Sequence, residues 1–223
     1  MNNDTFRTDR GLHLTLVSSS TQSKLFVMFM KGCERRMGRL VKQNVGISLE
    51  LLRELLLRLE EGLMDENVTE QRKRELVVGG VAFVILWVGA LRGGEVLLLE
   101  ASELVKRRND GRDLKDNDHV VVPLMGRFKG ETGERNLLLV LANETGSGIE
   151  TRKWIKRLIG LLIMEGKHLD VGPAICDSTG LVYSMHTLNT LLYEMLEAVQ
   201  IEKPQLIPKD VVLADTYNVY RSF

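Results

Sequence analysis

The chain has 223 residues, of which 44% are hydrophobic and 27% charged, as in a soluble globular protein with one large domain, or one domain and an arm. Lysine plus arginine and aspartate plus glutamate both number 30, so zero net charge argues against a nucleic-acid binder that is basic over its whole surface. The two cysteines, Cys33 and Cys176, are far apart and predict neither a disulfide framework nor a metal site, and we expect no metal or cofactor.

We expect residues 1–45 to form an N-terminal arm and a basic segment, and residues 46–223 to form the main domain. The start of the chain is polar and unlike a secretory signal, and residues 1–23 show little periodicity. Residues 24–41 mix apolar and basic side chains, which fits either a helix or a hook with a basic edge. Reduced cysteines and the polar start together indicate an intracellular protein.

Two helices are predicted next, and each is opened by a hydroxyl side chain that can cap it. Ser48 opens a helix that continues to about residue 63 and places its leucines on one face. Thr69 opens a second helix that ends near residue 92 and is apolar around its whole circumference from residue 76 to 88. This second helix is therefore expected at the centre of the core. Its apolar stretch is short for a bilayer span and is flanked by charge, so we expect no membrane partner.

Arg92 lies at the end of the central helix. It is followed by Gly93 and Gly94, where the backbone can approach a ligand closely. A guanidinium beside a buried apolar wall is costly unless it is paired or meets an anion. Its planar fork fits the oxygens of a phosphate, which makes Arg92 a candidate phosphate ligand. The alternative is a structural ion pair between Arg92 and Glu95 at a helix junction.

A β-hairpin is predicted in the second half of the chain. Residues 120–129 are β-branched or alternate in polarity, residues 130–133 form a turn, and residues 136–141 return as the second strand. Lys129 is thereby placed at or near the hairpin tip, where an ordinary exposed lysine is the alternative to a functional one.

The remaining periodic segments are residues 96–104, 151–164 and 187–200, each amphipathic with helical spacing. A polar loop follows the first of them, and the second carries a basic face opposite its apolar one. With the earlier helices and the hairpin, these segments predict a mainly α-helical α+β fold with a small antiparallel hairpin or sheet.

Three segments, taken in order, resemble the catalytic domain of the tyrosine recombinases, the phage-integrase-like enzymes that break and rejoin DNA. Residues 89–95 (GALRGGE) resemble the first arginine box of that family, and residues 126–131 (GRFKGE) resemble its lysine hairpin. Residues 220–223 (YRSF) resemble the beginning of its second box, in the form found in the eukaryotic mobile-element branch. The resemblance covers residues 47–223 and implies an integrase-like catalytic core.

The resemblance implies transesterification at a phosphodiester of double-stranded DNA, in which a tyrosine forms a phosphotyrosyl bond without a metal or nucleotide cofactor. Arg92 and Arg221 would bind the non-bridging oxygens, and Lys129 would protonate the leaving 5′-oxygen. Other basic residues would contact the DNA backbone, with a solvated face as the alternative. They are Arg107, Arg108, Arg127, Arg152, Lys153, Lys156 and Arg157.

The chain departs from the family pattern in two ways. Arg221 stands where the family usually has a histidine, and an arginine is a poor proton shuttle near neutral pH. The second arginine, the third box and the nucleophilic tyrosine would all lie beyond Phe223, and none of the four tyrosines present matches the nucleophile position. We therefore expect a truncated recombinase domain that does not cleave DNA.

The expected function is DNA binding in DNA recombination or integration, with self-association on DNA and a nuclear location if the source is eukaryotic. The alternative is a non-catalytic DNA-binding or protein-interaction remnant of a mobile-element recombinase. A helical scaffold without a DNA role is the third hypothesis.

Overall fold

The structure is a computed structural model that describes residues 4–7, 13–16, 45–109, 119–126, 135–167, 169, 171–220, 222 and 223. The chain divides into two compact units, Met1–Gln43 and Asn44–Phe223. In the first unit, β1 (Asp4–Arg7) pairs antiparallel with β2 (His13–Leu16). The segment expected as a loose arm thus contains a two-stranded hairpin, whose strands of four residues are too short to give a clear period-two pattern.

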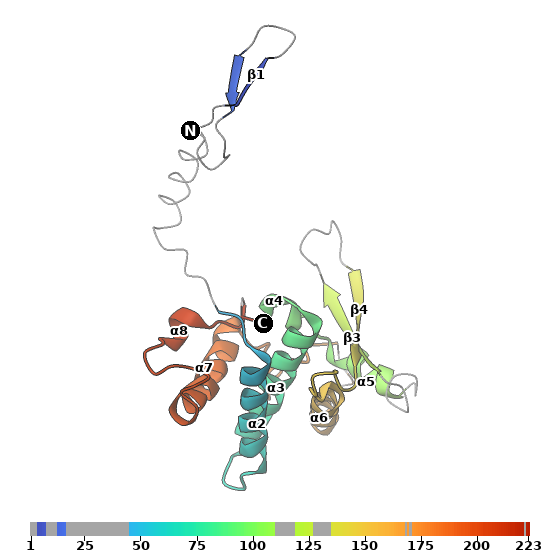
Figure 1. Ribbon diagram of the computed structural model, residues 1–223. Coiled ribbons are helices and arrows are strands. Elements are labelled where there is room, and N and C mark those ends of the chain that lie inside the picture. Colours follow the sequence, from blue (N-terminus) through green and yellow to red (C-terminus); the bar gives the residue numbers. More distant parts are fainter. Residues whose placement is uncertain are drawn as a thin grey trace. The chain divides into compact units, whose positions relative to one another are not determined.

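The second unit is built around two neighbouring helices, α2 (Leu49–Met64) and α3 (Glu70–Gly89), which Figure 1 shows side by side. Both predicted caps are confirmed, because the Leu51 N–H donates to Ser48 Oγ at 3.2 Å and the Arg72 N–H donates to Thr69 Oγ1 at 3.2 Å. Every residue of α3 from position 76 to 86 is buried, so α3 is the central core helix that its uniform apolar character predicted.

Three more helices surround this pair. They are α5 (Ala101–Asn109), α6 (Thr151–Met164) and α7 (Met185–Glu202). At the contact between α3 and α6, a Cβ atom on Gly80 would lie 2.1 Å from the ring of Trp154. Glycine at this position lets the fully buried indole lie flat against the backbone of the central helix, which joins α3 and α6 into one core.

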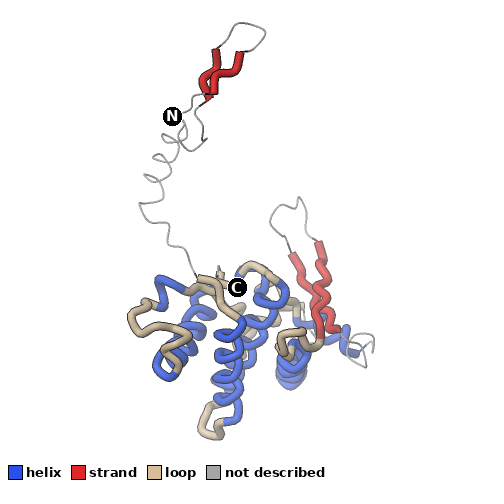
Figure 2. The backbone as a smooth tube through the Cα atoms, in the orientation of Figure 1, coloured by secondary structure: helices blue, strands red, loops and turns tan. Residues whose placement is uncertain are grey.

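The hairpin expected in the second half is present as β3 (His119–Gly126) and β4 (Arg135–Ala142). Its register runs from His119↔Ala142 to Gly126↔Arg135. Figure 2 shows these strands at the edge of a body that is otherwise helical, with two single-turn helices, α4 (Gly93–Val96) and α8 (Leu213–Thr216). The predicted class, mainly α with a small antiparallel β element, is confirmed.

The amphipathic segment expected over residues 96–104 is broken between α4 and α5. Glu100 causes the break by capping α5, because its carboxylate accepts the main-chain N–H of Ser102 at 3.0 Å and of Glu103 at 2.7 Å. It also accepts the N–H of Gly172 at 3.2 Å. Burial alone would raise the pKa of Glu100, but these hydrogen bonds outweigh it and lower the pKa. The cap is therefore charged at neutral pH, and its contribution to stability is lost as pH falls through that lowered pKa.

Candidate functional site

The C-terminal end of α3 is where the chain turns and presents Arg92. Ala90 follows the helix in the left-handed conformation, with φ of 49°, and Arg92 then begins α4. Arg92 is exposed, and its guanidinium forms no ion pair with any described residue. Oε2 of Glu95 accepts a hydrogen bond from the main-chain N–H of Arg92 at 2.9 Å, which fixes the backbone of this turn.

The structure differs from two expectations about Arg92. The carboxylate of Glu95 binds the backbone of Arg92, so the ion pair offered as the structural alternative does not form. Leu91 and Gly93 are buried on either side, whereas Arg92, which was expected beside a buried apolar wall, is exposed. An anion that binds this guanidinium would therefore displace no ion pair with a described residue.

The end of the described chain packs directly against the residue that follows Arg92. A Cβ atom on Gly93 would lie 2.9 Å from Cα of Tyr220 and 3.0 Å from the carbonyl oxygen of Val219. Only glycine permits this approach of two backbones. The segment that resembles the first arginine box therefore touches the segment that resembles the beginning of the second, and Figure 1 shows the C-terminus beside α4.

Contacts with the helical core hold the C-terminal segment in this position, among them a hydrogen bond and a ring contact. The main-chain N–H of Val219 donates to Oδ1 of Asn189 on α7 at 2.8 Å. The ring of Phe223 stacks on Phe83 of α3 with centroids 5.3 Å apart and an interplanar angle of 16°. Both partners come from the helical core, so the segment is part of the folded unit.

The hairpin meets the same end of α3. A Cβ atom on Gly89 would lie 2.8 Å from Cδ2 of Leu139, so β4 packs against the last turn of the central helix. Lys129 and Arg127 belong to the connection between β3 and β4, which lies outside the described residues, as does Arg221. The structure thus brings strand β4 and the C-terminal segment to the end of α3 that carries Arg92, and of the three predicted catalytic side chains it describes Arg92.

Arg107 and Arg108 were expected in a polar loop, but their backbone belongs to the last turn of α5. The helix continues past residue 104 because lysine and arginine are good helix formers, favoured near a helix C-terminus. The side chains of these two arginines lie outside the described part of the chain.

Two of the four predicted DNA contacts on α6 are neutralised by acidic partners. Nζ of Lys153 lies 2.8 Å from Oε1 of Glu60 and 2.9 Å from Oε2 of Glu150, and these hydrogen bonds raise the pKa of Lys153. The guanidinium of Arg157 lies 3.3 Å from the same Glu60 carboxylate and 4.8 Å from the centre of the Trp154 ring. These contacts join α6 to α2, which favours a structural role for both cations.

The other two cations on α6 lack such partners. Lys156 is exposed and Arg152 is half-buried, and neither forms an ion pair with a described residue. Both line a surface hollow of about 500 Å³ at the start of α6, and the other charged residues that line it are Glu144, Glu150 and Lys153. The basic face predicted from the sequence therefore reduces to these two side chains.

The four tyrosines fall into two groups. Tyr183 and Tyr217 are buried, which raises the pKa of both hydroxyls, and the hydroxyl of Tyr193 donates to the carbonyl oxygen of Tyr217 at 3.1 Å. Tyr220, by contrast, is 52% exposed. It is thus the most exposed of the four tyrosines.

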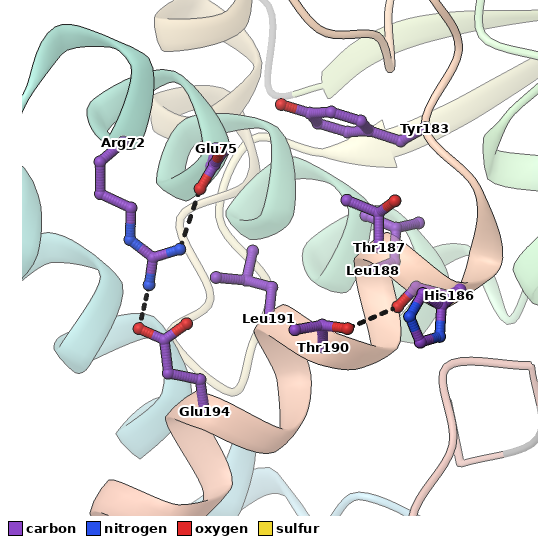
Figure 3. Close-up of a pocket in the computed structure, with 9 residues that line it drawn as sticks. All are labelled: Arg72, Glu75, Tyr183, His186, Thr187, Leu188, Thr190, Leu191 and Glu194. Atoms are coloured by element: carbon purple, nitrogen blue, oxygen red, sulfur yellow. Dashed lines mark hydrogen bonds and ion pairs between the residues drawn. The ribbon is translucent and has the colours of Figure 1, made fainter.

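A second cavity, of about 270 Å³, lies between the first turns of α3 and the first half of α7 (Figure 3). Its walls include an arginine, Arg72, two carboxylates, Glu75 and Glu194, and the buried Tyr183. No sequence motif marked this cavity, because its residues come from segments that only the fold brings together.

Within the described ranges, no three histidine, cysteine, aspartate or glutamate side chains are grouped to hold a metal ion, and no helix is both long and apolar enough to cross a membrane. Comparison of the chain with protein-family models, curated proteins and solved structures found no match. The case for a function therefore depends on the residues and their geometry.

Proposed function

We propose that the chain binds double-stranded DNA through the end of α3 and the start of α6, with a fold related to the catalytic core of the tyrosine recombinases. The observation that carries this proposal is the backbone contact between Gly93 and residues 219–220. It joins two segments that are far apart in the sequence and that resemble the two arginine boxes of one family. A chance resemblance gives no reason for these segments to meet.

The proposed role of Arg92 is to bind a DNA phosphate. Its exposed guanidinium can donate two parallel hydrogen bonds to one phosphate, and the turn that carries it is fixed by Glu95. By resemblance, Arg221 would bind the same phosphate and Lys129 would protonate a leaving 5′-oxygen. A site of this kind would serve DNA strand transfer in recombination or integration.

Salt dependence of DNA binding tests this proposal. Each phosphate contact releases counterions, and the described cations suited to contact DNA are Arg92, Arg152 and Lys156. With about three contacts, the affinity for a labelled duplex should fall about 40-fold between about 50 and 200 mM salt. Fluorescence anisotropy with duplexes of unrelated sequence measures it. Undetectable binding at the lower salt concentration would reject the proposal.

Cations on α6 with and without an acidic partner should differ in their effect on DNA affinity in this assay. Lys156→Ala removes an exposed charge without a described partner and should weaken DNA binding about fivefold and reduce the salt slope by about one. Lys153→Ala, whose ammonium is already bound by two carboxylates, should change affinity less than twofold, by the same reasoning about charge. Equal losses in the two variants would contradict this division of the basic face.

We expect these 223 residues to form no covalent adduct with a nicked suicide duplex. A phosphotyrosyl bond requires a tyrosine oxygen in line with the departing 5′-oxygen, and Tyr183, Tyr193 and Tyr217 are buried or hydrogen-bonded. Tyr220 is exposed but does not match the family's nucleophile position. A denaturing gel followed by mass spectrometry checks this, and an adduct on Tyr220 would make that residue the nucleophile instead.

One observation favours the alternative of a protein-interaction remnant. On β4, the apolar side chains of Leu138 and Val140 are 47% and 60% exposed. Their partners across the hairpin are Val121 and the buried Pro123, so the apolar surface offered to a second copy consists of Leu138 and Val140. Analytical ultracentrifugation should then detect self-association that Leu138→Ser with Val140→Ser abolishes. A native chain that stays monomeric with and without DNA would remove this candidate.

A further inference from the structure

The cavity of Figure 3 shares no residue with the proposed DNA-binding site. Its floor is apolar, because Leu188 and Leu191 are buried in the core beneath it. Its volume of about 270 Å³ is slightly below the range of sites for drug-sized molecules, which suits a small ligand or a single side chain.

The charges around this cavity are unequal. Nη1 of Arg72 donates to Oε2 of Glu75 at 3.0 Å, and Nη2 donates to Oε1 of Glu194, so both ends of the guanidinium fork are occupied. Each carboxylate keeps a second oxygen that accepts no hydrogen bond from a described residue. Apart from His186, the lining carries two negative charges, on Glu75 and Glu194, against the one positive charge of Arg72. The cavity therefore favours a cation and disfavours an anion.

Tyr183 supplies an independent sign that something binds here. The residue is only 8% exposed, and its hydroxyl has no hydrogen-bond partner among the described residues. Figure 3 shows this hydroxyl pointing toward the side of the cavity that carries Glu75 and Arg72. A buried hydroxyl without a partner is costly, and native structures rarely leave one unless a ligand or water completes it.

We propose that this cavity binds a small organic cation, an ammonium or guanidinium group on a short apolar stem. The stem would lie on Leu188 and Leu191, and the charged head would donate to the open carboxylate oxygens and to the hydroxyl oxygen of Tyr183. A free amine and the lysine or arginine side chain of another protein share this chemistry. The proposal does not depend on DNA binding.

An NMR titration of the full ¹⁵N-labelled chain tests the proposal with four probes of similar stem length. n-Butylammonium and n-butylguanidinium should shift amide signals of residues 186–194 and saturate, and butyrate and n-butanol should bind at least about tenfold more weakly. A lysine tripeptide with blocked ends tests whether the cation comes from another protein. If the tripeptide binds more tightly than n-butylammonium, the site is assigned to a protein partner. If it binds equally or more weakly, the site is assigned to a free amine. Butyrate that binds as well as n-butylammonium would overturn the proposal, as would shifts confined to other residues.

Two tyrosine variants separate binding from folding. Tyr183→Phe removes only the unpartnered hydroxyl, so it should weaken n-butylammonium binding about tenfold while the melting temperature stays equal or rises. Tyr193→Phe is the matched control, because its hydroxyl binds the carbonyl oxygen of Tyr217: it should lower the melting temperature and leave amine affinity unchanged. Unchanged amine affinity in Tyr183→Phe, or a melting temperature lowered as in Tyr193→Phe, would show that the hydroxyl serves the fold and would overturn the proposal.

Discussion

Replacing Arg74 with methionine should lower the free energy of unfolding by about 3 kcal/mol. Arg74 is 2% exposed on α3, and its Nε and Nη2 each donate to a different oxygen of Glu165 at 2.9 Å. Nη1 also donates to the carbonyl oxygen of Cys176. Breaking a buried pair from one side costs about 3–5 kcal/mol, and the lower end applies because Glu165 is partly exposed and keeps Lys167 at 3.5 Å.

Chemical denaturation measures this loss, and two variants calibrate it. Lys73→Met, at the neighbouring position, removes a pair with the exposed Glu70 and should change stability by no more than about 1 kcal/mol. Arg74→Met combined with Glu165→Met removes both charges and should recover much of the loss, because no unpaired charge remains. If Arg74→Met were no more destabilising than Lys73→Met, the buried fork would not hold α3 to the segment after α6.

Gly80→Ala should destabilise the protein by about 1–3 kcal/mol, although alanine favours a helix more than glycine does. The added methyl group would lie 2.1 Å from Cζ3 and 2.4 Å from Cε3 of Trp154. Trp154 is 1% exposed and cannot turn outward, so α3 and α6 would have to separate. The loss measures how tightly these two helices are packed.

Gly160→Ala on α6 is the matched control, since a Cβ atom there meets nothing within 4 Å. It should stabilise the protein by about 0.5–1 kcal/mol through helix propensity alone. Opposite signs for the two substitutions, read from urea midpoints, support the packing. A stabilising Gly80→Ala would mean that the indole of Trp154 lies elsewhere.

The helices could be predicted from the sequence because their signals are local. Ser48 and Thr69 are followed by apolar periodicity within one turn, and the structure uses both hydroxyls as caps. The uniform apolar character of residues 76–88 likewise marked α3 as the core helix, since a helix without a polar face must be covered on all sides.

The contacts that decide the role of each charge could not be predicted, because their partners are distant in the chain. Arg74 looks like a surface residue in its own helix, and its partner Glu165 lies 91 positions away. Lys153 likewise belongs to a basic run, and Glu60 from α2 neutralises it. The sequence around either residue does not indicate these ion pairs.

The candidate site was predicted in part. The order of the three recombinase-like segments marked Arg92, and the fold brings the neighbouring Gly93 against Val219 and Tyr220. The exposure of Tyr220 could not be predicted, because alternating apolar residues near the end of the chain look alike whether they face the core or solvent. The hydrogen bond from the main-chain N–H of Arg92 to the carboxylate of Glu95 was not predicted either, since the spacing of two residues does not tell which of their atoms meet.

The DNA affinity of Arg92→Ala tests the central claim most directly. Arg92 is exposed and forms no ion pair with a described residue, so its loss should leave the melting temperature unchanged. Lys209→Ala also removes an exposed charge and serves as the control. In anisotropy titrations at low salt, Arg92→Ala should bind duplex about tenfold more weakly with a salt slope lower by about one, and Lys209→Ala should bind as the native chain does. Equal affinity in Arg92→Ala and Lys209→Ala would contradict a phosphate-binding role for the end of α3.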